Sequence, residues 1–106
     1  MAVSSFYSVE DIIAAIKNAD SYRNKAADTG HFIFVDAVID AELALKQACL
    51  TDLQCEVLYY RWMLGLKQHE VSTLLGRSRE SVGMAEVRSK QKIQRVLDNW
   101  EAENAF

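Results

Sequence analysis

Basic and hydrogen-bonding side chains gather in one part of this 106-residue sequence, between residues 67 and 95. That segment has seven basic and three acidic side chains, a local charge of +4, whereas residues 1–50 have a local charge of −3. A concentrated basic segment suits an anionic surface such as a nucleic-acid backbone, because phosphate contacts supply most of the non-specific affinity. The net charge of −3 argues weakly against such a partner, so the distribution of charge is the more informative feature.

The residue types that usually support catalysis do not form a recognisable constellation. His31 and His69 stand alone, whereas a zinc site needs three or four ligands. Cys49 and Cys55 do not make a disulfide framework and are expected as reduced thiols. The sequence also has no glycine-rich phosphate loop. We therefore expect a non-enzyme with no catalytic residues, no metal ion and no cofactor.

Composition favours an all-α fold of about five helices. The chain has no proline and four glycines, which disfavours turn-rich β folds. Its length suits one compact domain. We divide it into a flexible N-terminus (1–7), an N-terminal helical pair (8–50), a helix-turn-helix module (51–100) and a tail (101–106).

Cap residues mark where the predicted helices begin. Ser8 with Asp11, and Thr51 with Gln54, have the spacing of capping boxes. The first helix is expected to fade before Thr29-Gly30. The further predicted helices span about 31–49, 51 to Gly65, 68–75 and 79–99.

A short helix, a tight turn and a longer helix are predicted between His69 and Asn99. Gly76 allows a left-handed turn and Ser78 caps the second helix. The first helix is expected to turn Val71, Leu74 and Leu75 inward, and the small Ser72 permits close approach. The predicted buried face of the second helix consists of Val82, Ala85, Ser89, Ile93, Val96 or Leu97, and Trp100. This pattern predicts a helix-turn-helix, whose second helix enters the major groove by its N-terminal end.

Residues 51–97 resemble the fourth conserved region of bacterial sigma factors and the small phage-encoded regulators built on the same module. Three segments carry the resemblance: Leu50-Thr51-Asp-Leu-Gln54, Gly65-Leu-Lys-Gln-His-Glu-Val71 and Ser78-Arg-Glu-Ser-Val82. The segment Asp36-Ala-Val-Ile-Asp40 also looks like the helix that precedes this module in phage regulators. The resemblance implies a C-terminal helix-turn-helix with an N-terminal helical extension.

The resemblance also implies roles for individual residues. The Arg and Glu that open the recognition helix read promoter bases in the family, and those positions are Arg79 and Glu80; Arg can bind guanine and Glu can accept from cytosine. Gly83-Met84 departs from the Arg-Gln that primary sigma factors often carry, and Met84 could contact a thymine methyl. The expected base-reading residues are Arg79, Glu80, Ser81 and Met84. The expected phosphate-contacting residues are Lys67, Gln68, Arg77, Ser78, Arg88 and Lys90.

Two functions from different classes remain open at this point. The first is a DNA-binding transcription regulator, phage or prophage encoded, that reads promoter or operator DNA in the bacterial cytoplasm. Double-stranded DNA would be its partner, with RNA polymerase as a further partner and a homodimer formed through Trp100, Phe106 and the N-terminal helix; no membrane is expected. The alternative is a protein-interaction module that binds RNA polymerase or another protein as an inhibitor or decoy, which the overall acidity and Gly83-Met84 favour. Lys92 and Arg95 suit either phosphate contacts or a solvated helix face.

Overall fold

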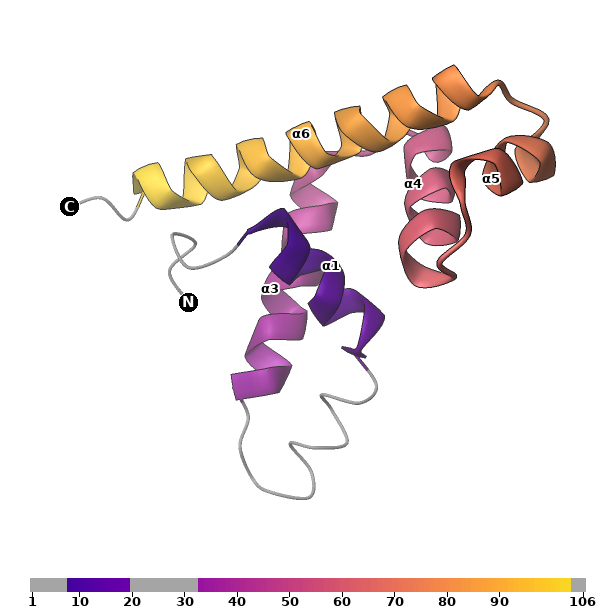
Figure 1. Ribbon diagram of the computed structural model, residues 1–106. Helices are drawn as coiled ribbons and strands as arrows, with labels where there is room; N and C mark the ends of the chain where they lie inside the picture. Colours follow the sequence, from indigo (N-terminus) through magenta and orange to yellow (C-terminus); the bar gives the residue numbers. More distant parts are fainter. Residues whose placement is uncertain (1–7, 20–32, 104–106) are drawn as a thin grey trace.

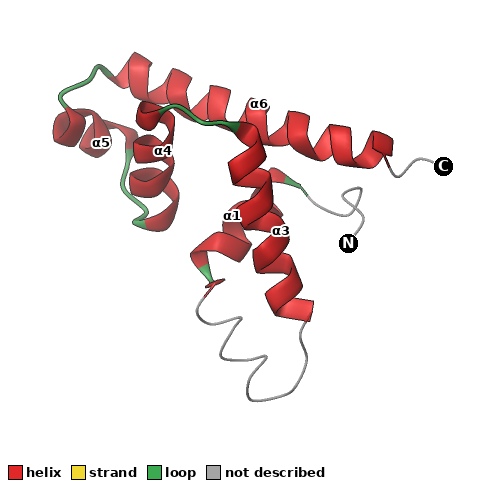
Figure 2. Ribbon diagram, turned by 180° about the vertical axis from the view of Figure 1, so that it is seen from behind, coloured by secondary structure: helices red, strands yellow, loops and turns green. Residues whose placement is uncertain are grey.

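The computed structural model describes residues 8–19 and 33–103, and these residues form an all-α architecture (Figures 1 and 2). No strand occurs within these two ranges, so the predicted fold class is confirmed. The elements are α1 (Val9–Lys17), α3 (Ile33–Ala48), α4 (Asp52–Leu58), the π-helix η2 (Tyr59–Met63), α5 (Gln68–Leu75) and α6 (Arg79–Glu103).

Both predicted capping boxes form. The Asp11 backbone N–H donates to Ser8 Oγ at 3.1 Å, and the Ser8 N–H donates to the Asp11 carboxylate at 2.8 Å. At the start of α4, the Gln54 N–H donates to Thr51 Oγ1 at 3.2 Å and the Thr51 N–H donates to Gln54 Oε1 at 3.0 Å. Each box satisfies amide groups that the first turn of a helix leaves unpaired, which explains why these helices begin where they do.

Helix α6 is the long helix against which α1, α3, α4 and α5 pack, as Figure 1 shows. Helices α4 and α5 lie beside its N-terminal part, while α1 and α3 lie farther toward its C-terminal part. Two hydrophobic clusters correspond to this division. The smaller joins Val57, Val71, Val82 and Ala85. The larger joins α1, α3 and Leu58 to the second half of α6. Helix α6 therefore connects α4 and α5 to the N-terminal helices α1 and α3 as one continuous element.

The predicted buried face of α6 is confirmed at every position. Its buried residues are Val82, Ala85, Glu86, Ser89, Ile93, Val96, Leu97 and Trp100. Trp100 is 3 % exposed, and its Nε1 donates to Gln47 Oε1 at 2.8 Å. The proposal that Trp100 lies at an exposed dimer interface is therefore wrong, because its ring belongs to the core between α3 and α6. Phe106 lies outside the described residues.

Several predicted boundaries differ from the structure. Helix α1 ends at Lys17, where the Asn18 side chain donates to the Ala14 carbonyl at 2.8 Å. The expected stop at Thr29-Gly30, the flexible segment 1–7 and residues 104–106 of the tail lie outside the described residues. Helix α6 continues to Glu103, into the predicted tail.

The helix that begins at Asp52 widens into a π-helix over Tyr59–Met63. A five-residue hydrogen-bond spacing is uncommon and often marks a functional site, and here it rotates the following side chains relative to α4. Tyr59 is 52 % exposed, whereas Tyr60 packs against the smaller cluster and Trp62 against the larger one. The aromatic side chains of Tyr59, Tyr60 and Trp62 are therefore divided between core and surface.

Candidate nucleic-acid interface

The turn between α5 and α6 has the predicted backbone. Gly76 ends α5 with φ 64°, the left-handed conformation that favours glycine. The Arg77 N–H donates to the Ser72 carbonyl at 3.0 Å, and the Ser72 hydroxyl donates back to the Arg77 carbonyl. The Ser81 N–H donates to Ser78 Oγ at 3.1 Å, which caps α6. These bonds fix the direction in which the N-terminal end of α6 points.

Packing of α5 against α6 depends on few side chains. Val71 and Val82 are fully buried, and Leu75 packs against the same cluster. Leu74 is 56 % exposed, so the prediction that it turns inward is wrong. Positions 71 and 75 lie one helical turn apart on the same face, whereas position 74 is rotated about 100° from position 75. One face of this eight-residue helix contacts α6, and Leu74 lies outside it.

The first turns of α6 present exposed polar and charged side chains. Arg77, Ser78, Arg79 and Glu80 are exposed, and Ser81 is partly buried. Within the described part of the chain, the guanidinium groups of Arg77, Arg79 and Arg88 have no hydrogen-bond or ion-pair partner. Arg77 and Arg79 at the N-terminal end of α6, and Arg88 about two and a half turns farther along the helix, are therefore available to an external ligand.

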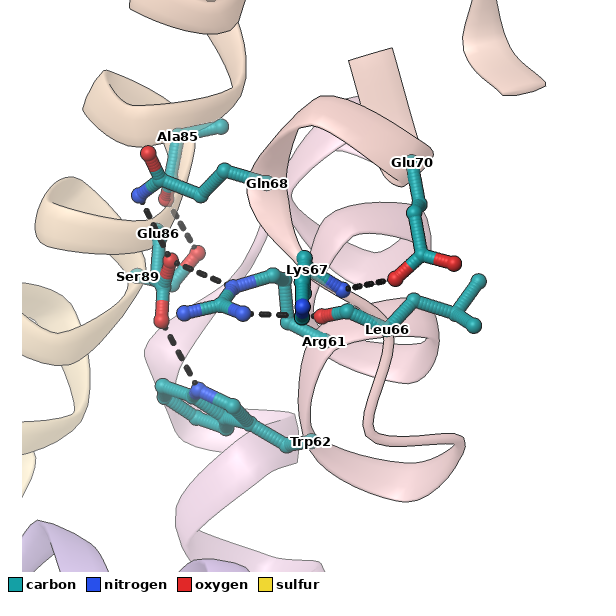
Figure 3. A network of polar contacts seen from close by, with 9 residues as sticks. All are labelled: Arg61, Trp62, Leu66, Lys67, Gln68, Glu70, Ala85, Glu86 and Ser89. Atoms are coloured by element: carbon teal, nitrogen blue, oxygen red, sulfur yellow. Dashed lines mark hydrogen bonds and ion pairs between the residues drawn. The ribbon is translucent and has the colours of Figure 1, made fainter. Parts of the chain in front are cut away.

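A buried carboxylate holds α6 against the segment that leads into α5 (Figure 3). Glu86 Oε1 accepts from Arg61 Nε at 3.0 Å and from Gln68 Nε2 at 3.3 Å, and Glu86 Oε2 accepts from Trp62 Nε1 at 3.0 Å. Arg61 Nη1 also donates to the Leu66 carbonyl at 2.8 Å. This Glu86 network therefore connects η2, the loop before α5, α5 itself and α6.

The environment of Glu86 favours its ionised form. Burial raises the pKa of this carboxyl, but the hydrogen bonds from Arg61, Trp62 and Gln68, together with the Arg61 charge, outweigh burial and lower it. The net pKa lies below the ordinary value for Glu. A buried charge of this kind is tolerated only when it is paired and hydrogen-bonded, as it is here.

The predicted phosphate-contacting residues divide into two groups. Lys67, Arg77, Ser78 and Arg88 are exposed at the start of α5, in the turn after it and in the first half of α6. Gln68 instead donates to Glu86, and its amide fills the space beside Gly83, 3.6 Å from where a Cβ would lie. Lys90 lies over the Trp62 ring at 5.2 Å. Gln68 and Lys90 thus have side-chain contacts within the protein, although Gln68 is also exposed. We call the other four the accessible set; in it, only Ser78 makes a hydrogen bond through its side-chain oxygen within the described residues, as the cap of α6.

Residue spacing did not single out the Glu86 network. Arg61 and Trp62 lie 25 and 24 residues from Glu86, so no local motif connects them. One signal was present, because Glu86 lies between Ala85 and Ser89 in register with the predicted buried face of α6. A charged residue on a buried face requires a partner, and an arginine or tryptophan on a neighbouring helix can provide one.

The remaining candidates are the two cysteines and the side chains of the types that bind metal ions. Cys49 and Cys55 are free and exposed thiols. No group of three or more His, Cys, Asp or Glu side chains in residues 8–19 and 33–103 is arranged to hold a metal ion. Over the same residues, no helix has the length and apolar character needed to cross a membrane.

Comparison with protein families, curated proteins and solved structures finds no match to this chain.

Proposed function

We propose that this protein is a DNA-binding transcription regulator of the sigma region four-like type, acting without catalysis or a cofactor. The observation that carries the proposal is the α5–turn–α6 arrangement, with the capped N-terminal end of α6 exposed; Arg77 and Arg79 beside that end, and Arg88 farther along α6, have no partner among the described residues. In a helix-turn-helix, that end of the second helix contacts base edges in the major groove. The Glu86 network stabilises the orientation that such docking requires.

The exposed side chains suit distinct roles in a DNA complex. Arg79 would bind guanine through two hydrogen bonds, and Glu80 would accept from cytosine. The Ser81 hydroxyl, which can donate or accept, would bond to either kind of base-edge group. Met84 adds an apolar contact. The accessible set for phosphates is Lys67, Arg77, Ser78 and Arg88. Because the basic groups are concentrated in this module, the net charge of −3 does not prevent local attraction to DNA.

The biological setting follows from the sequence resemblance and is part of the proposal. We place the protein in a bacterial cell, encoded by a phage or prophage, with promoter or operator DNA as its target. A single helix-turn-helix contacts a short half-site, so a homodimer on two half-sites would increase affinity. RNA polymerase would be a second partner in an activator.

A selection from randomised duplex DNA at near-physiological salt tests the proposal. We expect an enriched motif and a steep fall in affinity with salt. Three exposed cationic side chains, Lys67, Arg77 and Arg88, predict a slope of log affinity against log salt of about −2.7, from about −0.9 for each phosphate neutralised. A folded, helical protein that enriches no motif would contradict the proposal.

One observation favours the alternative of a protein-interaction module. An apolar groove of about 380 Å³ runs between α1, α3 and the α4–η2 segment, with Ile13, Leu45, Leu58 and Trp62 among its lining residues. Apolar grooves of this kind accept helices of partner proteins. RNA polymerase or another protein captured without DNA, by a chain that enriches no motif, would support this second function.

A further inference from the structure

The outward face of α6 carries an apolar pair in the middle of the proposed DNA-contacting surface. Met84 and Val87 are each 48 % exposed, although both could have been polar at no cost to the core. They lie three residues apart on one helix, so they are neighbours on its surface. Large apolar side chains exposed together are more informative than scattered ones, because water disfavours contiguous apolar area.

The position of this pair follows from helix geometry. Successive residues are rotated by about 100°, and the buried face of α6 is centred on Val82, Ala85 and Ser89. The opposite direction falls on Glu80, Met84 and Val87, which are all exposed. The side chains that point farthest from the core are thus one acid followed by two apolar groups.

The chemistry of the pair limits what it can recognise on DNA. Neither side chain donates or accepts a strong hydrogen bond, so neither reads the N6, N7, O6 or N4 groups of base edges. The C5-methyl group of thymine is the apolar group that a base pair presents in the major groove. The unbranched Met84 can adapt to a methyl group at slightly different positions.

We infer that Met84 and Val87 select DNA carrying thymine methyl groups at two positions beside the base read by Glu80. This inference rests on the proposed DNA-binding function and specifies the chemical class of its target. Arg88 lies one helical turn after Met84 on the same side of α6, and Arg79 adds exposed positive charge at the N-terminal end of the helix; this charge favours an anionic partner over an apolar protein groove at this face. A thymine-bearing duplex provides both phosphates for the arginines and methyl groups for the apolar pair.

The expected size of the effect comes from the burial of one methyl group. Removing a buried carbon of this kind costs about 0.8 kcal/mol, which is about a fourfold loss of affinity. Loss of both methyl groups should weaken binding about fifteenfold if the two contacts are independent.

The test replaces thymine by deoxyuridine, which removes the methyl group and keeps the hydrogen-bonding edge. The motif enriched by the full-length protein is resynthesised with deoxyuridine at each thymine in turn, and affinity is measured by fluorescence anisotropy. Two replacements should each weaken binding about fourfold. The Met84→Ala protein should lose sensitivity at one of them and Val87→Ala at the other, whereas Ile39→Ala, an exposed apolar control on α3, should keep both.

The outcomes separate this inference from the proposed function. Sequence-specific binding that tolerates deoxyuridine at every thymine would overturn the inference and leave the DNA-binding function in place. The inference would also be overturned if Met84→Ala and Val87→Ala both kept the wild-type sensitivity to deoxyuridine, because other side chains would then contact the thymine methyl groups. Failure to enrich any motif would overturn the proposed function and this inference together.

Discussion

Replacement of Glu86 by glutamine is expected to destabilise the protein, because it removes a buried charge while keeping the shape of the side chain. The two carboxylate oxygens accept from Arg61, Gln68 and Trp62. A glutamine amide has one acceptor oxygen and one NH₂ donor. Whichever way the amide turns, at least one of the three donors will face another donor.

The cost can be worked from these contacts. A buried donor left without a partner costs about 1–3 kcal/mol, and hydrogen bonds to a neutral acceptor are about half as strong as those to a charged one. The Arg61 side chain is 28 % exposed and that of Glu86 is 9 % exposed, so water partly compensates the guanidinium. We therefore expect a loss of about 2–3 kcal/mol, less than the roughly 3–5 kcal/mol for a fully buried pair. The melting temperature should fall by roughly 10–20 °C.

Thermal and urea unfolding at pH 7, followed by circular dichroism, measure this loss. Glu101→Gln is the matched control, because Glu101 is an exposed acid on the same helix, and its effect should stay within about 0.5 kcal/mol. A Glu86→Gln protein as stable as the control would refute the structural role assigned to the Glu86 network.

The remaining predictions concern pH, backbone conformation and charge. Because the folded pKa of Glu86 is depressed, its stabilisation is complete above the unfolded pKa, about 4.3, and is lost as pH falls through the folded pKa. Acid unfolding should therefore affect the wild type more steeply than Glu86→Gln, and parallel pH curves would contradict this. Gly76→Ala should lower the free energy of unfolding in urea by about 1 kcal/mol, because φ is 64° at this position. Gly83→Ala, inside α6, should raise the free energy of unfolding by up to about 1 kcal/mol, since its Cβ would meet the Gln68 amide at an ordinary 3.6 Å. Changes of the same sign in the two variants would be inconsistent with the fold. Lys67→Ala should reduce the salt slope of DNA binding by about 1 without changing base preference, as competition titrations would show.

Local features of the fold could be predicted because their determinants lie a few residues apart. The capping boxes at Ser8 and Thr51, the left-handed Gly76 and the cap at Ser78 each depend on contacts within three to five residues. The buried face of α6 follows from 3.6-residue periodicity over a long helix. The short α5 offers fewer repeats, which is why periodicity misplaced Leu74.

Features that depend on tertiary contacts could not be predicted in the same way. The partners of Glu86 come from η2 and α5, and the π-helix that presents Arg61 and Trp62 has no sequence signature in these residues. The exposed position proposed for Trp100 also failed, because Gln47 satisfies its indole N–H only when α3 packs on α6. Arg77, Arg79 and Arg88 are exposed, and their expected contacts with DNA stay predictions.

The most direct test of the DNA-binding proposal compares base preference in the wild type, Arg79→Ala and Arg95→Ala. Both arginines are exposed on α6 and carry the same charge, but only Arg79 lies at the N-terminal end. A selection from randomised duplex DNA should give one motif for the wild type and for Arg95→Ala. Arg79→Ala should lose preference for guanine at one position, at a cost of about 1–3 kcal/mol. An identical motif from Arg79→Ala, or no motif from the wild type, would contradict base reading by the N-terminal end of α6.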